Sequence, residues 1–185
     1  PQLVAALNVP VVAAGGMADA AGVRAAMALG AAGVQTGTVW LCCPEATTSA
    51  VHRAALTGPD AAHTALTTAF TGRPARGIVN RAMRELGHLP ATAPAFPTAT
   101  AAMAPLRSHW EAQGRGDFTP LWAGQNTRGC RPVPAAEVVN TLAAGLSRGP
   151  DRHVDGPYVP SLRPRRPLPV AQCRRSEIAP VTSVT

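Results

Sequence analysis

Two short apolar runs that each end in a glycine turn constrain the fold of this chain more than any other feature. The first covers residues 11–16 (VVAAGG) and the second covers residues 33–38 (GVQTGT). Between them, residues 19–29 carry apolar side chains at helical spacing, and Asp19 stands where an N-cap is expected. A strand, a helix and a second strand connected in this way form a parallel pair. We therefore expect both glycine turns at the same, carboxyl-terminal edge of one sheet.

These two turns have the composition of a phosphate site. Glycine allows a positive φ and lets bare N–H groups approach a ligand, and Thr38 adds a hydroxyl donor to the second turn. In a β/α barrel, the turns after the last two strands are the usual phosphate position. The alternative is two tight turns that need glycine for their geometry alone. Neither turn has the GxGxxG spacing of a dinucleotide-binding fold, so that fold is not indicated.

The distribution of charge argues against nucleic acid as a partner. The net charge is +7, and all 17 basic residues are arginine. Seven of these arginines, against three acidic residues, lie in residues 148–185. No basic stripe with interleaved aromatic side chains crosses the rest of the chain, as a nucleic-acid surface would require.

The cysteines and the hydropathy pattern predict a cytoplasmic protein. Adjacent cysteines do not easily bridge each other, and no pair has zinc-ligand spacing, so we expect no metal site and interpret all four as small buried side chains in a reducing compartment. No apolar run reaches the length of a membrane span, so no membrane partner is expected. The four cysteines are Cys42, Cys43, Cys130 and Cys173.

The chain divides into three parts by composition. We assign residues 1–57 to the last two strand and helix units of a TIM-like (β/α)8 barrel, with helices at residues 2–7 and from Pro44 towards Leu56. Residues 58–147 are expected to be a mainly helical region of the same α/β domain. Residues 148–185, rich in Pro and Arg, are expected to be disordered. Because a complete barrel needs about 250 residues and the chain begins at Pro1, we expect it to be the C-terminal part of something larger.

Four segments closely resemble the nitronate monooxygenase family, also called the 2-nitropropane dioxygenase family. They are residues 10–19 (PVVAAGGMAD), 28–41 (ALGAAGVQTGTVWL), 71–80 (TGRPARGIVN) and 121–125 (LWAGQ). The resemblance covers about residues 1–147. The first two segments are also similar to FMN-dependent enoyl-carrier-protein reductases. The last two favour nitronate monooxygenase.

The resemblance implies a cofactor, a reaction and a set of binding residues. Family members are FMN-dependent β/α barrels that oxidise alkyl nitronates with O₂ to a carbonyl compound and nitrite. Their catalytic base is a histidine at the end of an earlier barrel strand. No histidine of this chain matches that position, so we expect the base upstream of Pro1 and assign none here. The residues implied to hold the FMN phosphate are Gly15, Gly16, Gln35, Thr36, Gly37 and Thr38.

Several alternatives stay open at this point. The chain could belong to an enoyl-thioester reductase that uses NAD(P)H. It could also be a non-catalytic fragment, which would fold poorly and bind FMN weakly because two strands leave open sheet edges. Arg73 and Arg76 could bind an anion, although a structural role in their loop is preferred. Residues 122–125 could line the flavin pocket or pack on the barrel rim. The five histidines are interpreted as surface or helix-packing residues.

Overall fold

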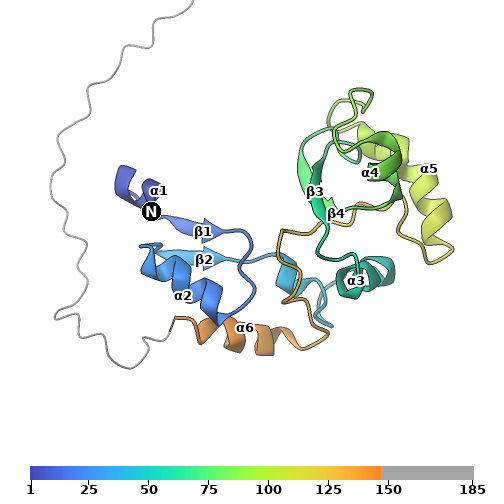
Figure 1. Ribbon diagram of the computed structural model, residues 1–185. Helices are drawn as coiled ribbons and strands as arrows, with labels where there is room; N and C mark the ends of the chain where they lie inside the picture. The colour runs from blue at the N-terminus through green and yellow to red at the C-terminus, as the bar shows by residue number, and fades with distance from the viewer. Residues whose placement is uncertain (147–185) are drawn as a thin grey trace, which may run out of the picture. The chain divides into compact units, whose positions relative to one another are not determined.

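The computed structural model describes residues 1–146, and the expectations for the tail and for Cys173 lie outside these residues. The chain is α/β. After the short helix α1 (Gln2–Ala6), strand β1 (Val12–Ala14), helix α2 (Ala20–Ala28) and strand β2 (Gly33–Gln35) follow in order. Strands β1 and β2 pair in parallel, with Val12 opposite Gly33 and Ala14 opposite Gln35 (Figure 1). The predicted strand, helix, strand unit is confirmed.

Helix α2 begins at the expected cap and buries one face. The Gly22 N–H donates to Asp19 Oδ1 at 2.8 Å, and Val23 is completely buried. Helix α6 (Ala135–Ala143) packs beside α2 (Figure 1). Together they close a small apolar core made of Val23, Val39, Cys43, Val138 and Leu142.

The chain after β2 differs from the expectation that a helix begins near Pro44. A single 3₁₀ turn, η1 (Thr38–Trp40), comes first, and helix α3 (Ala50–Thr57) begins only after Ser49, whose hydroxyl accepts from the His52 N–H at 3.3 Å. The intervening loop is fixed by Arg53. Its guanidinium donates to the carbonyls of Cys42, Cys43, Ala46 and Thr48 at 2.6–3.1 Å. With these carbonyls satisfied by a side chain, the loop needs no helical hydrogen bonds.

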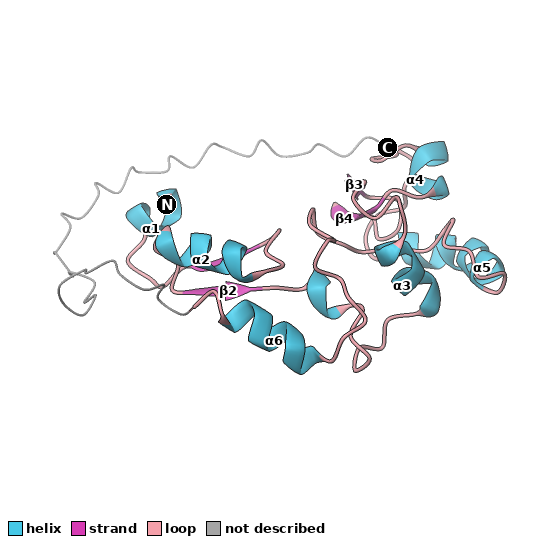
Figure 2. Cartoon of the chain, turned by 60° about the horizontal axis from the view of Figure 1, so that its bottom comes forward, coloured by secondary structure: helices cyan, strands magenta, loops and turns pink. Residues whose placement is uncertain are grey.

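The region from residue 58 onward contains the expected helices, and residues 64–78 add a pair of strands that was not predicted. Strands β3 (Thr64–Thr67) and β4 (Ala75–Ile78) form an antiparallel pair (Figure 2). Residues 121–123 add to the free edge of β4, where the Ile78 N–H donates to the Leu121 carbonyl at 2.8 Å. The threonine-rich segment becomes a strand because β-branched side chains fit a pleated surface. Helices α4 (Arg81–Leu86) and α5 (Ala99–Glu111) complete the region.

Asn80 fixes the start of α4 and the loop beside it. Its side chain is 6% exposed. The Oδ1 atom accepts from the Met83 N–H at 3.3 Å, which caps the helix, and the Nδ2 atom donates to the carbonyls of Gly116 and Thr119, each at 2.9 Å. One buried amide therefore joins two segments more than 30 residues apart in sequence.

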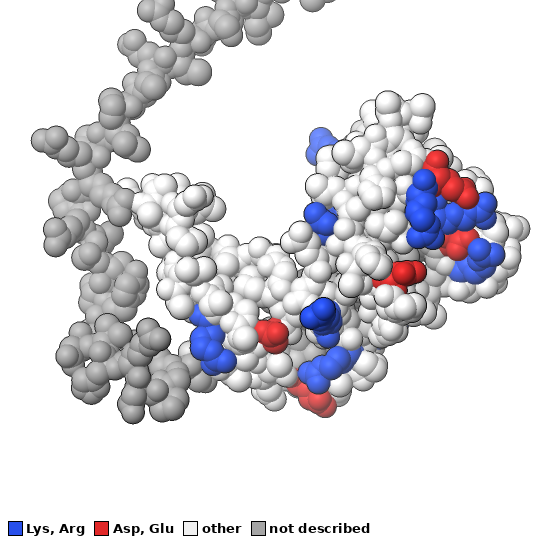
Figure 3. All heavy atoms as spheres, in the orientation of Figure 1, with Lys and Arg blue, Asp and Glu red and all other residues white. Residues whose placement is uncertain are grey.

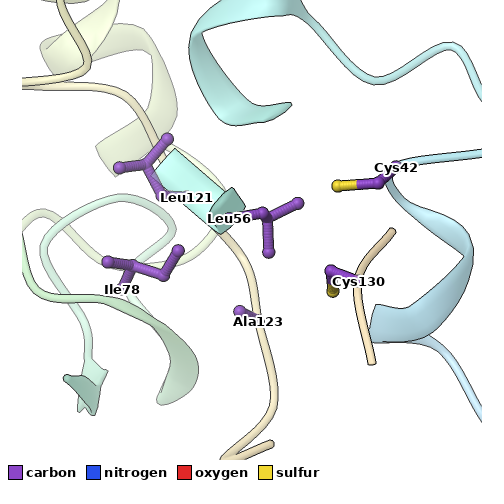
Figure 4. Packing of buried hydrophobic residues seen from close by; sticks show 6 residues of the cluster. All are labelled: Cys42, Leu56, Ile78, Leu121, Ala123 and Cys130. Carbon is purple, nitrogen blue, oxygen red and sulfur yellow. The ribbon is translucent and has the colours of Figure 1, made fainter. Parts of the chain in front are cut away.

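A second apolar cluster connects the loop after η1 with α3, β4 and the 121–130 segment (Figure 4). Three of the four cysteines are described, and all three are buried and free, as predicted for small core side chains. The cluster therefore joins segments that are distant in sequence. Its members are Cys42, Leu56, Ile78, Leu121, Ala123 and Cys130.

The surface carries mixed charges in the region of α4. Arg81 lies 2.7 Å from Glu85, and Arg115 lies 2.6 Å from Asp117. On the face seen in Figure 3, basic and acidic side chains lie next to each other there. Such exposed pairs contribute little to stability, because solvent screens them. Within residues 1–146, no helix is both long enough and apolar enough to cross a membrane.

Candidate functional site

The first glycine turn leaves β1 with a backbone that only glycine adopts readily. Gly15 has φ of +99° and Gly16 has φ of +72°, and both are exposed. A Cβ atom added at either position would meet no atom within 4 Å. Glycine is therefore required at these two positions by the positive φ angles and not by neighbouring atoms. The surface above the two glycines is open.

The second turn leaves β2 with a different backbone. Gln35 is the last residue of the strand, and Gly37 has φ of −123°, so the expectation of a positive φ is wrong for this glycine. A Cβ atom at Gly37 would also meet nothing within 4 Å. The turn is held by Trp40, whose Nε1–H lies 2.9 Å from the Thr36 carbonyl and 3.1 Å from its hydroxyl. Sequence reasoning did not assign this role to Trp40.

The two turns lie at the same edge of the parallel pair, as predicted. Ala14 is opposite Gln35, so the residues that follow each strand leave the sheet together. The N–H groups of Gly16, Gly37 and Thr38 have no acceptor among residues 1–146. Free backbone N–H groups around an open surface are typical of anion sites. Three backbone N–H groups without an acceptor among the described residues therefore lie on the two turns at this edge.

A distant segment connects the two turns. The Gly124 N–H donates to Thr38 Oγ1 at 2.9 Å, and Asn126 Nδ2 donates to the Gly16 carbonyl at 3.0 Å. The Cys130 thiol donates to the Thr38 carbonyl at 3.2 Å. This segment was a candidate for the flavin pocket or the barrel rim, and the structure places Gly124 against the second turn. Asn126 was not predicted, because no local pattern relates it to a glycine 110 residues earlier.

Arg73 and Arg76 make contacts that suit their loop. Arg76 Nη1 donates to the Thr64 carbonyl at 3.1 Å and lies 3.3 Å from the Thr64 hydroxyl. The Arg73 guanidinium lies 4.5 Å from the centre of the Phe96 ring. These contacts, with a carbonyl, a hydroxyl and a ring, support the structural interpretation.

His52 has a structural contact. Its Nε2 atom is 3.0 Å from the Trp122 carbonyl, so the ring joins α3 to the segment that continues to Gly124. Burial lowers the pKa of His52, because the charged ring is poorly solvated there. The ring is therefore neutral at physiological pH, and Nε2 is the donor to the carbonyl.

The buried thiols are not nucleophiles. Burial raises the pKa of Cys130 to about 12, and it also raises the pKa of Cys42. A thiol with such a pKa is almost fully protonated at pH 7, whereas thiolate is the reactive form. Cys42 and Cys130 therefore act as core side chains beside the second turn.

Known proteins of one family match this chain in sequence. Residues 1–145 match the sequence model of the nitronate monooxygenase family. A nitronate monooxygenase from Pseudomonas aeruginosa is 44% identical over 141 residues, which cover 75% of this chain and 40% of that protein. A probable nitronate monooxygenase from Bacillus subtilis is 42% identical over 143 residues, or 77% of this chain and 41% of that protein. The chain thus spans about 40% of the length of these relatives.

Solved structures also match this chain, in both fold and sequence. A nitroalkane oxidase from Streptomyces ansochromogenes matches with a TM-score of 0.70 and 43% identity, over 78% of this chain and 41% of that one. FabK from Thermotoga maritima matches with a TM-score of 0.58 and 26% identity, over 78% of this chain and 46% of that one. Both measures of similarity are higher for the nitroalkane oxidase.

Proposed function

The chain belongs to the nitronate monooxygenase family, and from this premise we propose that its two glycine turns hold the phosphate of FMN in a flavin-dependent oxidoreductase. The observation that carries the proposal is the open cradle at the edge of β1 and β2. Three N–H groups there have no acceptor within residues 1–146, and no atom stands within 4 Å of the missing Cβ atoms of Gly15, Gly16 and Gly37. Such a cradle suits a compact anion.

The residues have distinct roles in this proposal. The N–H groups of Gly16, Gly37 and Thr38 bind phosphate oxygens, and Gly15 shapes the first turn. Thr38 Oγ1 already accepts from Gly124, so its own hydrogen remains available for the phosphate. Thr36 Oγ1 accepts from the Trp40 Nε1–H, so its own hydrogen is likewise available for the phosphate. Gln35 ends the strand with its side chain exposed.

We further propose that β1 and β2 are two neighbouring strands of a β/α barrel. The family assignment and the parallel pair with its covering helices support this arrangement. The described residues contain one parallel pair, whereas a barrel of this type has eight strands. The part of the relatives that this chain does not match would supply the others.

The proposed reaction is the oxidation of an alkyl nitronate by O₂ to a carbonyl compound and nitrite, in the cytoplasm. Bound FMN supplies the electron-transfer chemistry. The residues described here contribute binding and orientation through the phosphate, and none of their histidines lies at the two turns. We therefore assign no catalytic base to this chain.

Nitrite release tests the reaction directly. A full-length version, which also carries the part of the relatives that this chain does not match, is supplied with FMN and mixed with propyl-2-nitronate in air, and nitrite is measured against a sample without FMN. FMN-dependent nitrite release is the expected result. A protein that neither binds FMN nor releases nitrite would contradict the proposal.

One other activity is supported by a specific observation, the similarity of the first two motifs to enoyl-carrier-protein reductases. In that case, crotonyl-thioester would cause consumption of NAD(P)H, and propyl-2-nitronate would yield no nitrite. The two assays, run on the same preparation, separate the two activities.

A further inference from the structure

Residues 124–126, which we call the latch, contact both glycine turns at once. The first turn receives the Asn126 amide and the second receives the Gly124 N–H, at 3.0 and 2.9 Å. The turns belong to consecutive strands, whereas the latch comes more than 80 residues later in the chain. A short segment fixed to both turns limits how far they can separate.

The orientation of the Asn126 amide is determined by two partners. Its Oδ1 atom accepts from the Arg128 N–H at 3.1 Å, so the Nδ2 atom must be the one that faces the Gly16 carbonyl. An aspartate of the same shape would keep the first bond and lose the second, because a carboxylate cannot donate to a carbonyl.

At the other end of the latch, Gly124 approaches the second turn closely. A Cβ atom added to Gly124 would lie 3.2 Å from Thr38 Oγ1, which is tighter than an ordinary contact. Donation by the Gly124 N–H also determines which way the Thr38 hydroxyl points. A side chain at position 124 would therefore require the Thr38 hydroxyl to shift by a few tenths of an ångström.

We propose that the latch sets the spacing of the two turns for a phosphate, and that Asn126 is the positioning residue that holds it in place. This inference rests on the proposed FMN site, and it adds residues that act on the phosphate through the turns and do not touch it. With Asn126 removed, the first turn can move away from the second, and the three N–H groups no longer converge on one anion.

Amide exchange tests the latch without any ligand. In the 185-residue chain, hydrogen exchange at the Gly124 N–H is compared between the native protein and the variants Asn126→Ala and Asn126→Asp. We expect exchange to become about threefold to tenfold faster in both, the range for loss of one hydrogen bond. The matched controls are Asn140→Ala and Asn140→Asp on α6, where the side chain is exposed. Unchanged exchange in the Asn126 variants, or an equal rise in the controls, would overturn the proposal.

Ligand binding tests the link to phosphate. FMN and riboflavin, which differ by the phosphate group, are titrated into the native chain and into Asn126→Ala. We expect FMN to bind about threefold to tenfold more weakly to the variant, with riboflavin unaffected. An equal loss for both ligands would contradict the proposal. If native protein does not bind FMN, the proposed function fails, and the exchange measurement still decides the latch.

A second variant keeps the proposal testable if the Asn126 variants do not fold. Gly124→Ala crowds the Thr38 hydroxyl from the opposite end of the latch and leaves Asn126 intact. It should weaken FMN binding and leave riboflavin binding unchanged. Native affinity for FMN in this variant would overturn the proposal.

Discussion

The glycine turns and the β3–β4 sheet use the same residue type for opposite purposes. At Gly16 and Gly37, an added Cβ atom would meet open space. At Gly77 in β4, it would lie 2.9 Å from the Leu121 carbonyl, because residues 121–123 pair with that edge. Glycine in the turns leaves room for a ligand, and glycine in β4 leaves room for the chain itself. Stability and binding should therefore respond to different substitutions.

The largest effect on stability is expected at Asn80, in the packed region. Asn80→Ala removes a helix cap and leaves the buried Thr119 carbonyl without a donor, while the Gly116 carbonyl keeps its bond from the Thr119 N–H. We expect the free energy of unfolding to fall by about 2–4 kcal/mol, measured by urea denaturation. Asn80→Asp keeps the acceptor for the Met83 N–H but places a carboxylate oxygen against the two carbonyls, so its loss should be at least as large. Near-native stability of the alanine variant would show that this region is not the stable part.

Gly77→Ala should have the next largest effect. The new methyl group would collide with the Leu121 carbonyl and separate residues 121–123 from β4. Overpacking of this kind costs about 1–3 kcal/mol, which the same urea titration measures. A stable Gly77→Ala protein would mean that the edge pairing is loose and that the comparison of the two regions fails.

Substitution of the turn glycines should have smaller effects on stability, and the two positions should differ from each other. Gly16→Ala forces alanine to a φ of +72°, which costs about 1–2 kcal/mol. Gly37→Ala, at a φ of −123° and with no neighbour within 4 Å, should stay within about 0.5 kcal/mol of the native protein. Thermal denaturation of the pair separates the two cases. Equal losses would show that the turns share one backbone requirement.

The smallest effect concerns pH. Because burial lowers the pKa of His52, the unfolded chain binds more protons at this group than the folded chain does below about pH 7. Its contribution to stability is therefore present above the ordinary pKa of 6.5 and is lost as the pH falls through the lowered one. His52→Gln should flatten the dependence of unfolding free energy on pH between about 7.5 and 5. If the pH dependence of the unfolding free energy is unchanged in His52→Gln, another group must cause the loss of stability at low pH.

Local sequence rules predicted the parts of the fold that depend on neighbouring residues. The cap at Asp19, the parallel strands and the turn at Gly15 and Gly16 follow from spacing and glycine, and the structure contains them. The late start of α3 was missed, because it depends on Arg53 binding loop carbonyls. The strand of residues 64–67 was missed because it does not alternate clearly between apolar and polar residues.

The candidate site was predicted only in part, for a similar reason. The two turns meet at one edge because they follow consecutive parallel strands, and sequence order is enough to place them there. The contacts of Asn126 and Gly124 join residues 110 and 86 positions apart, and no periodicity encodes such contacts. FMN binding itself remains a prediction, which rests on the family and on the open cradle.

Backbone amide chemical shifts give the most direct test of phosphate binding at the two turns. FMN, riboflavin and inorganic phosphate are each titrated into the isotope-labelled chain. FMN and phosphate should shift the amide signals of Gly16, Gly37 and Thr38, whereas riboflavin should leave these signals unchanged and Gly77 should not respond to any of the three. Unchanged amide chemical shifts of Gly16, Gly37 and Thr38 at a high FMN concentration would contradict phosphate binding at the two turns. Shift changes concentrated in the β3–β4 region would contradict it as well.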